Sequence, residues 1–193
     1  MARPRQVSDA QIEEAARAAF LEHGPSVSLA RIAERLGISA PALLKRVGSK
    51  DELLLAAMAP DGAAPFDALL RDGPVAARAV DAQLVEILVA MTAFLRETMP
   101  RLLTLRAGGT PVPAMLGEAR GPAPVRRDLA AWLRRAERAG LARVPDPAAM
   151  ADLLVGVVEA RCVMEHLMAR RRRGDRRWAE RTVRALWGGI DPE

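Results

Sequence analysis

Hydroxyl groups, small side chains and positive charges are concentrated between residues 28 and 50, in a pattern that suits contact with the phosphates and base edges of DNA. Residues 1–50 contain eight Lys and Arg against five Asp and Glu, so they carry +3 of the chain's net charge of +5. Cations that neutralise phosphates release counterions, which drives much of the affinity for duplex DNA. The candidate DNA-binding residues are Ser28, Arg31, Ser39, Ala40, Pro41, Ala42, Leu44, Lys45, Arg46 and Lys50.

Two short amphipathic helices joined by a glycine are predicted to position these side chains. Ser28 is the N-cap of the first helix, because its hydroxyl can accept a backbone N–H of the first turn. Gly37 ends that helix, since a residue without Cβ readily takes the left-handed conformation of a tight exit. Ser39 caps the second helix, which turns Leu43 and Val47 inward. This arrangement predicts a helix-turn-helix, whose second helix enters the major groove.

Further helices are predicted on both sides of this pair. Ser8 and Gln11 form a capping box at the start of the first one, which ends at residues 23–25. Its apolar stripe consists of Ile12, Ala15, Ala16, Ala19 and Phe20. Ser49 and Glu52 form a second capping box, and the prolines and glycine of residues 60–65 interrupt the helix that follows.

The sequence from residue 11 to residue 54 resembles the DNA-binding domain of the tetracycline-repressor (TetR) family of bacterial transcription regulators. The segments AAFLEHG, ARIAERLGIS and PALLKRVGSKDELL occur in the order and spacing of that family. The resemblance implies an all-α fold with a helix-turn-helix domain at residues 1–58 and a helical effector-binding and dimerisation domain at residues 59–193. It also implies a ligand-responsive repressor that binds a palindromic operator as a homodimer, without enzymatic activity or a cofactor.

Two positions in the second helix depart from the family pattern. Leu44 and Val47 stand where the family usually has aromatic residues, and Arg46 stands where it commonly has His. We therefore expect a phosphate contact through charge rather than through a hydroxyl, and DNA binding that depends more steeply on salt. The alternative is that Leu44 packs inward and the chain is a helical dimerising adaptor with weakened or lost operator binding.

A long helix is predicted from Val75 to Met99, ending before Pro100, with a short helix at Leu102–Leu105 and another at Val125–Ala139. The resemblance implies an effector held among these central helices. The candidate lining residues are Leu88, Met91, Leu95, Met99, Leu103 and Met115, with Thr92, Arg106 and Thr110 as polar anchors. An aliphatic, methionine-rich lining suits an apolar or amphipathic compound, although these residues equally suit an ordinary core.

Two apolar helices are predicted near the C-terminus, one beginning at Asp146–Pro147 and one spanning Asp175–Trp187. Pairing with the same helices of a second subunit would form the four-helix interface through which the family dimerises. The candidate interface residues are Leu154, Val158, Cys162, Trp178, Val183, Leu186 and Trp187. The alternative is that these faces are fully used inside the monomer.

Other patterns carry less weight. Glu159, Cys162 and His166 share a helical face as metal ligands would, but a long helix presents such triples by chance and no metal site is predicted. The arginines of residues 170–173 suit either a second nucleic-acid patch or a solvated helix end. No nucleophile, base or phosphate loop indicates an enzyme. Without a signal peptide or an apolar run of about twenty residues, we expect a cytoplasmic protein.

Overall fold

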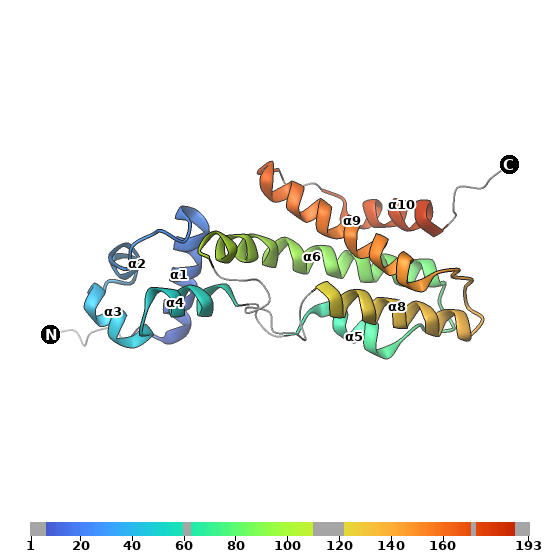
Figure 1. Cartoon of the computed structure of the whole chain (residues 1–193), viewed down its shortest axis with the longest axis horizontal. Helices are drawn as coiled ribbons and strands as arrows, with labels where there is room; N and C mark the ends of the chain where they lie inside the picture. The colour runs from blue at the N-terminus through green and yellow to red at the C-terminus, as the bar shows by residue number, and fades with distance from the viewer. Residues whose placement is uncertain (1–6, 60–62, 110–121, 171–172, 188–193) are drawn as a thin grey trace. The chain divides into compact units, whose positions relative to one another are not determined.

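The structure, a computed structural model, describes residues 7–59, 63–109, 122–170 and 173–187 of the 193-residue chain. Over these ranges it contains nine α-helices and no β-strand, which confirms the predicted all-α fold (Figure 1). Among these helices none combines the length and the apolar character needed to span a bilayer. The helices are α1 (Asp9–His23), α2 (Leu29–Leu36), α3 (Ala40–Val47), α4 (Lys50–Met58), α5 (Pro65–Asp72), α6 (Val80–Ala107), α8 (Pro122–Arg138), α9 (Pro147–Leu167) and α10 (Asp175–Trp187).

The chain forms two compact units. The first contains α1 to α4 and the end of α6 from Pro100 onward, and the second contains α5, the rest of α6, and α8 to α10. The domain boundary expected from the sequence, after residue 58, places all of α6 in the second domain. The end of α6 joins the first unit because Leu105 is fully buried among the apolar residues of that unit.

Serine caps begin all four helices of the first unit. Ser8 forms the predicted capping box with Gln11, and the hydroxyl of Ser49 accepts the backbone N–H of Glu52 at 3.1 Å. The helices enclose one apolar core. Its buried members are Ile12, Ala16, Ala19, Phe20, Val27, Ile32, Ala33, Leu43, Leu53, Leu54, Ala57, Met58 and Leu105.

The turn between α2 and α3 has the predicted left-handed glycine. Gly37 adopts φ 66° and ψ 28°, and the N–H of Ile38 bonds to the carbonyl of Ala33 at 3.1 Å, as at a helix end closed by a left-handed residue. The helix exit at Gly37 and the Ser39 cap two residues later therefore fix where α3 begins.

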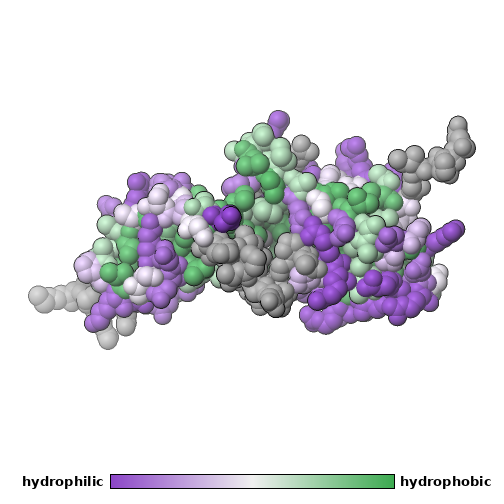
Figure 2. All heavy atoms as spheres, viewed as in Figure 1, coloured by the Kyte–Doolittle hydropathy of each residue, from purple (hydrophilic) through white to green (hydrophobic). Residues whose placement is uncertain are grey.

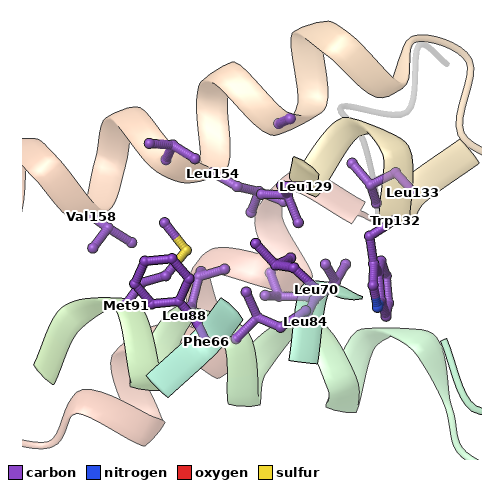
Figure 3. Packing of buried hydrophobic residues seen from close by; sticks show 14 of the residues in the cluster. Phe66, Leu70, Leu84, Leu88, Met91, Leu129, Trp132, Leu133, Leu154 and Val158 are labelled. Atoms are coloured by element: carbon purple, nitrogen blue, oxygen red, sulfur yellow. The ribbon is translucent and has the colours of Figure 1, made fainter. Parts of the chain in front are cut away.

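The second unit packs α5, α6, α8, α9 and α10 around a larger core. Figure 3 shows side chains from α5, α6, α8 and α9 pointing toward one another, including Leu88, Trp132 and Val158. Phe66 of α5 and Phe94 of α6 meet edge to face, with ring centroids 5.6 Å apart. This ring contact helps to hold α5 against α6.

The predicted interruption of the helix that follows Ser49 is confirmed, since α4 ends at Met58 and Pro65 begins a separate helix, α5, in whose first turn its fixed φ and missing N–H are tolerated. One helix prediction in this part of the chain needs correction. The helix predicted from Val75 begins at Val80, because the side-chain amide of Gln83 bonds to Val75 and to the carbonyl of Arg78, closing a turn ahead of the helix.

The predicted break before Pro100 is also wrong, since α6 continues through it to Ala107. An internal proline costs about 3 kcal/mol through the lost hydrogen bond and the ring clash. Burial of Leu105, with Leu102 and Leu103 half-buried, offsets that cost.

Candidate functional site

The second helix of the predicted helix-turn-helix, α3, exposes most of its side chains. Leu43 is its only fully buried residue, and Val47 is half-buried against the same core. The exposed residues are Pro41, Ala42, Leu44, Lys45 and Arg46, with Ala40 half-buried. The small residues at the start of α3 leave the backbone of its first turn accessible to a DNA groove. The cations lie at the other end of the helix.

The two serines of the candidate surface act as helix caps. The hydroxyl of Ser28 accepts the N–H of Arg31 at 3.3 Å, and that of Ser39 accepts the N–H of Ala42 at 3.3 Å. Both serines are exposed, and a hydroxyl that accepts one bond can still donate its own hydrogen to a phosphate oxygen. Arg31 is exposed in the first turn of α2, and Lys50 is half-buried in the first turn of α4.

Leu44 is 43% exposed, so its side chain does not pack inward. The alternative that Leu44 packs inward, from which weakened DNA binding was inferred, is therefore wrong on this point. An exposed leucine presents an apolar group to whatever α3 contacts, and it has no hydroxyl to donate or accept a hydrogen bond.

Arg46 is already engaged in the free protein. Its guanidinium donates to the carboxylate of Asp9, the first residue of α1, and to the backbone carbonyl of Val7, two residues before it. Sequence reasoning did not single out Asp9, because residues 37 apart in the chain reveal no pairing by spacing. Within the described part of the chain, no acidic side chain lies within ion-pair distance of the exposed Lys45.

Two other cations of the first unit are also neutralised locally. Arg35 donates to Glu22, and this hydrogen bond lowers the pKa of that carboxyl below its usual value. Arg17 lies 2.9 Å from Glu14 and donates to the carbonyl of Ala57 at 2.8 Å, at the end of α4 where carbonyls lack helix partners. Arg31 of α2 and Lys45 of α3 stay exposed on the surface of this unit.

The predicted interface residues of α9 and α10 divide into two groups. Leu154, Val158, Cys162 and Val183 are at most 2% exposed in the core of their own unit, so their side chains offer no surface to a second chain, and this part of the prediction is corrected. Trp178, Leu186 and Trp187 are half-buried and border open surface.

A second apolar stripe on α9 faces outward. Leu153 is 52% exposed, Met164 46%, and Leu167 and Met168 63% each. With Val157 and Ala160, the residues up to Met164 recur at intervals of three and four, and Leu167 and Met168 follow Met164 by three and four, which places all six on one side of the helix. Sequence analysis treated α9 as one broad apolar face, although the three-and-four spacing from Leu153 already indicated a separate stripe.

A groove of about 460 Å³ lies between this stripe and α10. Its lining is mostly apolar: Val157, Ala160, Arg161, Met164, Trp178, Thr182, Ala185 and Leu186. Figure 2 shows hydrophobic atoms gathered over α9 and α10. Exposed apolar surface of this kind, bordered by polar residues, is typical of protein interaction sites.

Neither the groove beside α10 nor the second hollow found among the described residues is lined by a candidate effector residue. Leu88, Met91 and Thr92 are fully buried in the core, and the hydroxyl of Thr92 donates to the carbonyl of Leu88 at 2.7 Å. The half-buried candidates are Leu95, Met99 and Leu103, and Arg106 is exposed. Thr110 and Met115 lie outside the described residues. A hollow of about 310 Å³ lies elsewhere, between Asp81 and Trp187.

The candidate metal ligands have other partners. Glu159 accepts a hydrogen bond from Arg126 at 2.5 Å, and the thiol of Cys162 points at the carbonyl of Thr92, 3.7 Å away. Burial raises the pKa of Cys162 to about 11. His166 is exposed, and no group of three metal-ligating side chains is found among the described residues. Arg170 and Arg173 are exposed, and residues 171–172 lie outside the described ranges.

Comparison with known proteins identifies relatives of both units. Residues 12–57 match bacterial regulatory proteins of the TetR family, and residues 82–186 match the C-terminal domain of AefR-like transcriptional repressors. Comparison with curated protein sequences finds no match.

Similar folds occur among solved structures. A protein from Mesorhizobium loti described as a TetR-family transcriptional regulator is 21% identical, with 93% of each chain covered and a TM-score of 0.65. The regulator FadR from Bacillus subtilis, in complex with stearoyl-CoA, is 13% identical over 95% of this chain and 100% of its own, with a TM-score of 0.64. The fatty acid degradation regulator FadR from Bacillus halodurans is 14% identical over 97% and 98%, with a TM-score of 0.65.

The family assignment follows from the extent of these matches. The C-terminal match alone covers more than half of the chain, and the N-terminal match covers the helices that present α3. The predicted resemblance is confirmed: the chain belongs to the TetR family of bacterial regulatory proteins and is a DNA-binding transcriptional regulator, not an enzyme.

Proposed function

We propose that this regulator is a ligand-responsive repressor that binds a palindromic operator as a homodimer, with α3 in the major groove. The observation that carries the proposal is the exposed face of α3, where Ala42, Leu44 and Lys45 point away from a core anchored by Leu43. A small and basic helix face can approach base edges closely while its cations bind flanking phosphates.

A palindromic operator requires two copies of α3 related by a twofold axis. The outward stripe of α9, from Leu153 to Met168, supports a second copy of this chain as its partner. Residues spaced at three and four along a helix suit helix-to-helix packing, and the groove beside them offers room for a side chain of the partner. The same patch on both subunits satisfies the self-complementarity that a twofold interface demands.

The test is selection of bound sequences from a random duplex library by the full-length protein. We expect a palindromic consensus with half-sites separated by about one helical turn or a multiple of it. A consensus without twofold symmetry would contradict the homodimeric mode of binding. Failure to prefer any duplex over heparin would favour the dimerising adaptor with lost operator binding.

A matched pair of variants assigns the binding to α3. Ala42→Glu places a negative charge on the exposed face of α3, and Ala18→Glu places one on an exposed position of α1. We expect the first to abolish enrichment and the second to leave the consensus intact. Equal loss in both would indicate a general charge effect in place of groove contact.

The proposed effector is an apolar or amphipathic compound. Half-buried Leu95 and Met99 supply adaptable apolar surface on the part of α6 that belongs to the second unit, and a similarly folded regulator, FadR from Bacillus subtilis, is in complex with stearoyl-CoA. Stearoyl-CoA is therefore the first probe, with free coenzyme A as the control. Release of the selected duplex by the acylated form alone would support the proposal, and no change in duplex affinity with either compound would contradict an acyl effector.

A further inference from the structure

Four charged side chains from three helices of the second unit form a closed cluster. Arg96 of α6 donates from Nη1 and Nη2 to both carboxylate oxygens of Asp175 in α10, at 2.7 and 2.8 Å. Its Nε donates to Glu165 of α9 at 2.9 Å. Arg161 of α9 donates to Asp175 at 2.9 Å and lies 3.1 Å from Glu165. Each acid therefore contacts both arginines.

The cluster is largely withdrawn from solvent. The side chains of Arg161 and Glu165 are 5% exposed, that of Arg96 is 14% exposed and that of Asp175 is 27% exposed. Two positive and two negative charges cancel, which permits burial that an isolated charge would oppose. The hydrogen bond from Arg96 also lowers the pKa of Asp175, so that the carboxylate stays ionised in its pairing with both arginines. Loss of one member would leave its partners buried with unbalanced charge.

The cluster is connected directly to the apolar groove between α9 and α10. The guanidinium carbon of Arg161 lies 4.5 Å from the ring centroid of Trp178, and both residues line the groove. Asp175 is the first residue of α10, and Trp178 follows it by one helical turn. Holding Asp175 therefore fixes the start of α10 and with it the position of the Trp178 ring in the groove wall.

We propose that Arg96 is a positioning residue for the self-association surface, acting through Asp175 and Arg161 on Trp178. Arg96 itself does not line the groove, and it belongs to α6, where its neighbour Leu95 is a candidate effector residue. This assignment rests on the proposed homodimer. It adds that a shift of α6 alters the shape of the groove, so that the affinity between subunits depends on a helix outside the contact surface.

The test compares the dimer dissociation constants of full-length variants by sedimentation equilibrium, with circular dichroism to verify helix content. Arg96→Met removes the shared donor, and Arg126→Met is the control because it breaks the ion pairs of Arg126 with Glu159 and Asp152 of α9 without touching α10. We expect Arg96→Met to weaken dimerisation by at least about tenfold, as loss of one partner from a buried charge cluster is costly. The control should stay within about twofold, as befits a more exposed pair.

A double-mutant cycle with Trp178→Phe separates positioning from general destabilisation. If Arg96 acts through the Trp178 ring, the two substitutions together weaken the dimer by less than the product of their separate effects. Additive effects would overturn the proposed route. If Arg96→Met does not fold, Arg96→Met/Asp175→Asn removes the charge of both partners together and takes its place in the cycle.

The outcomes distinguish the inference from the function on which it rests. A dimeric wild type whose dissociation constant is unchanged in the Arg96 variants overturns the positioning role alone. A wild type that is monomeric at every concentration overturns the homodimer, and the role of Arg96 falls with it.

Discussion

Arg46 of α3 is paired with Asp9 of α1, within one compact unit. The Asp9 side chain is 83% exposed and that of Arg46 is 36% exposed, so water and salt screen the pair and its contribution to folding is small. A DNA phosphate can therefore replace the carboxylate at little cost to the fold. If α3 binds DNA as we propose, Asp9 competes with a phosphate for the same guanidinium.

Removing the Asp9 charge is expected to strengthen DNA binding. In Asp9→Asn the competitor is lost. We expect affinity for the selected operator to rise by about threefold to tenfold at low salt. This range corresponds to one exposed ion pair together with the removed repulsion between Asp9 and the DNA phosphates. Fluorescence anisotropy with a labelled duplex measures the change. Glu13→Gln is the matched control, because it removes one negative charge from the same helix. Equal gains in both variants would show that Asp9 has no specific part.

The charge of Arg46 should also appear in the salt dependence of binding. Arg46→Ala is expected to reduce the slope of log affinity against log salt by about 0.9, the value for one phosphate contact on duplex DNA. Lys45→Ala serves as the comparison at an exposed neighbour without an acidic partner among the described residues. An unchanged slope in Arg46→Ala would show that Arg46 stays with Asp9 in the complex.

Adjacent leucines of α9 are expected to have opposite roles. Leu154 is 1% exposed, so Leu154→Ala should lower the free energy of unfolding by about 2–5 kcal/mol through lost burial and a residual cavity. Leu153 is 52% exposed, so Leu153→Ala should leave the unfolding of the dilute monomer nearly unchanged and weaken self-association instead. Urea unfolding and sedimentation measure the two quantities. The outward stripe would lose its assigned role if Leu153→Ala left dimerisation intact.

The parts of this fold that follow local rules could be predicted from the sequence. Ser8, Ser28 and Ser39 cap helices because their hydroxyls satisfy N–H groups only three residues away, and Gly37 ends α2 through its own backbone freedom. The bounds of α10, Asp175–Trp187, agree with the prediction for the same reason: an acidic residue follows a glycine, and apolar residues then recur at helical spacing.

The parts of the fold that depend on distant residues could not be predicted from the sequence. Continuation of α6 through Pro100 depends on burial of Leu105 in the other unit's core, and the local proline signal contradicts it. The contact from Arg46 to Asp9 and the cluster around Arg96 join residues 37 to 79 positions apart, and residue types alone do not select such partners. Burial of Leu154 beside exposed Leu153 likewise depends on which helices cover α9.

The same substitution at two glycines is expected to change stability in opposite directions. Gly37 has φ +66°, so Gly37→Ala should cost about 1 kcal/mol in backbone strain, although no atom lies within 4 Å of the added Cβ. Gly156 lies inside α9, also with nothing within 4 Å, so Gly156→Ala should gain about 0.5–1 kcal/mol from helix propensity. Thermal unfolding measures both. A loss at Gly156 would indicate that another chain approaches the helix there.

Cys162 is expected to control how the free energy of unfolding falls at alkaline pH. Burial raises its pKa to about 11 in the folded chain, above the ordinary value of 9.0, so between these values the unfolded thiol ionises while the folded thiol keeps its proton. The folded state then binds more protons than the unfolded state, and stability present below pH 9 falls as pH rises toward 11.

This fall can be assigned to one residue because the chain contains no Tyr and only two Lys to titrate in the same range. Cys162→Val should flatten the dependence of unfolding free energy on pH. At pH 8 the thiolate, which is the reactive form, should be about 100-fold scarcer in the folded chain, so a thiol reagent should label the native protein far more slowly than the urea-unfolded chain. Equally fast labelling of both states would show that Cys162 is neither buried nor held protonated by the core.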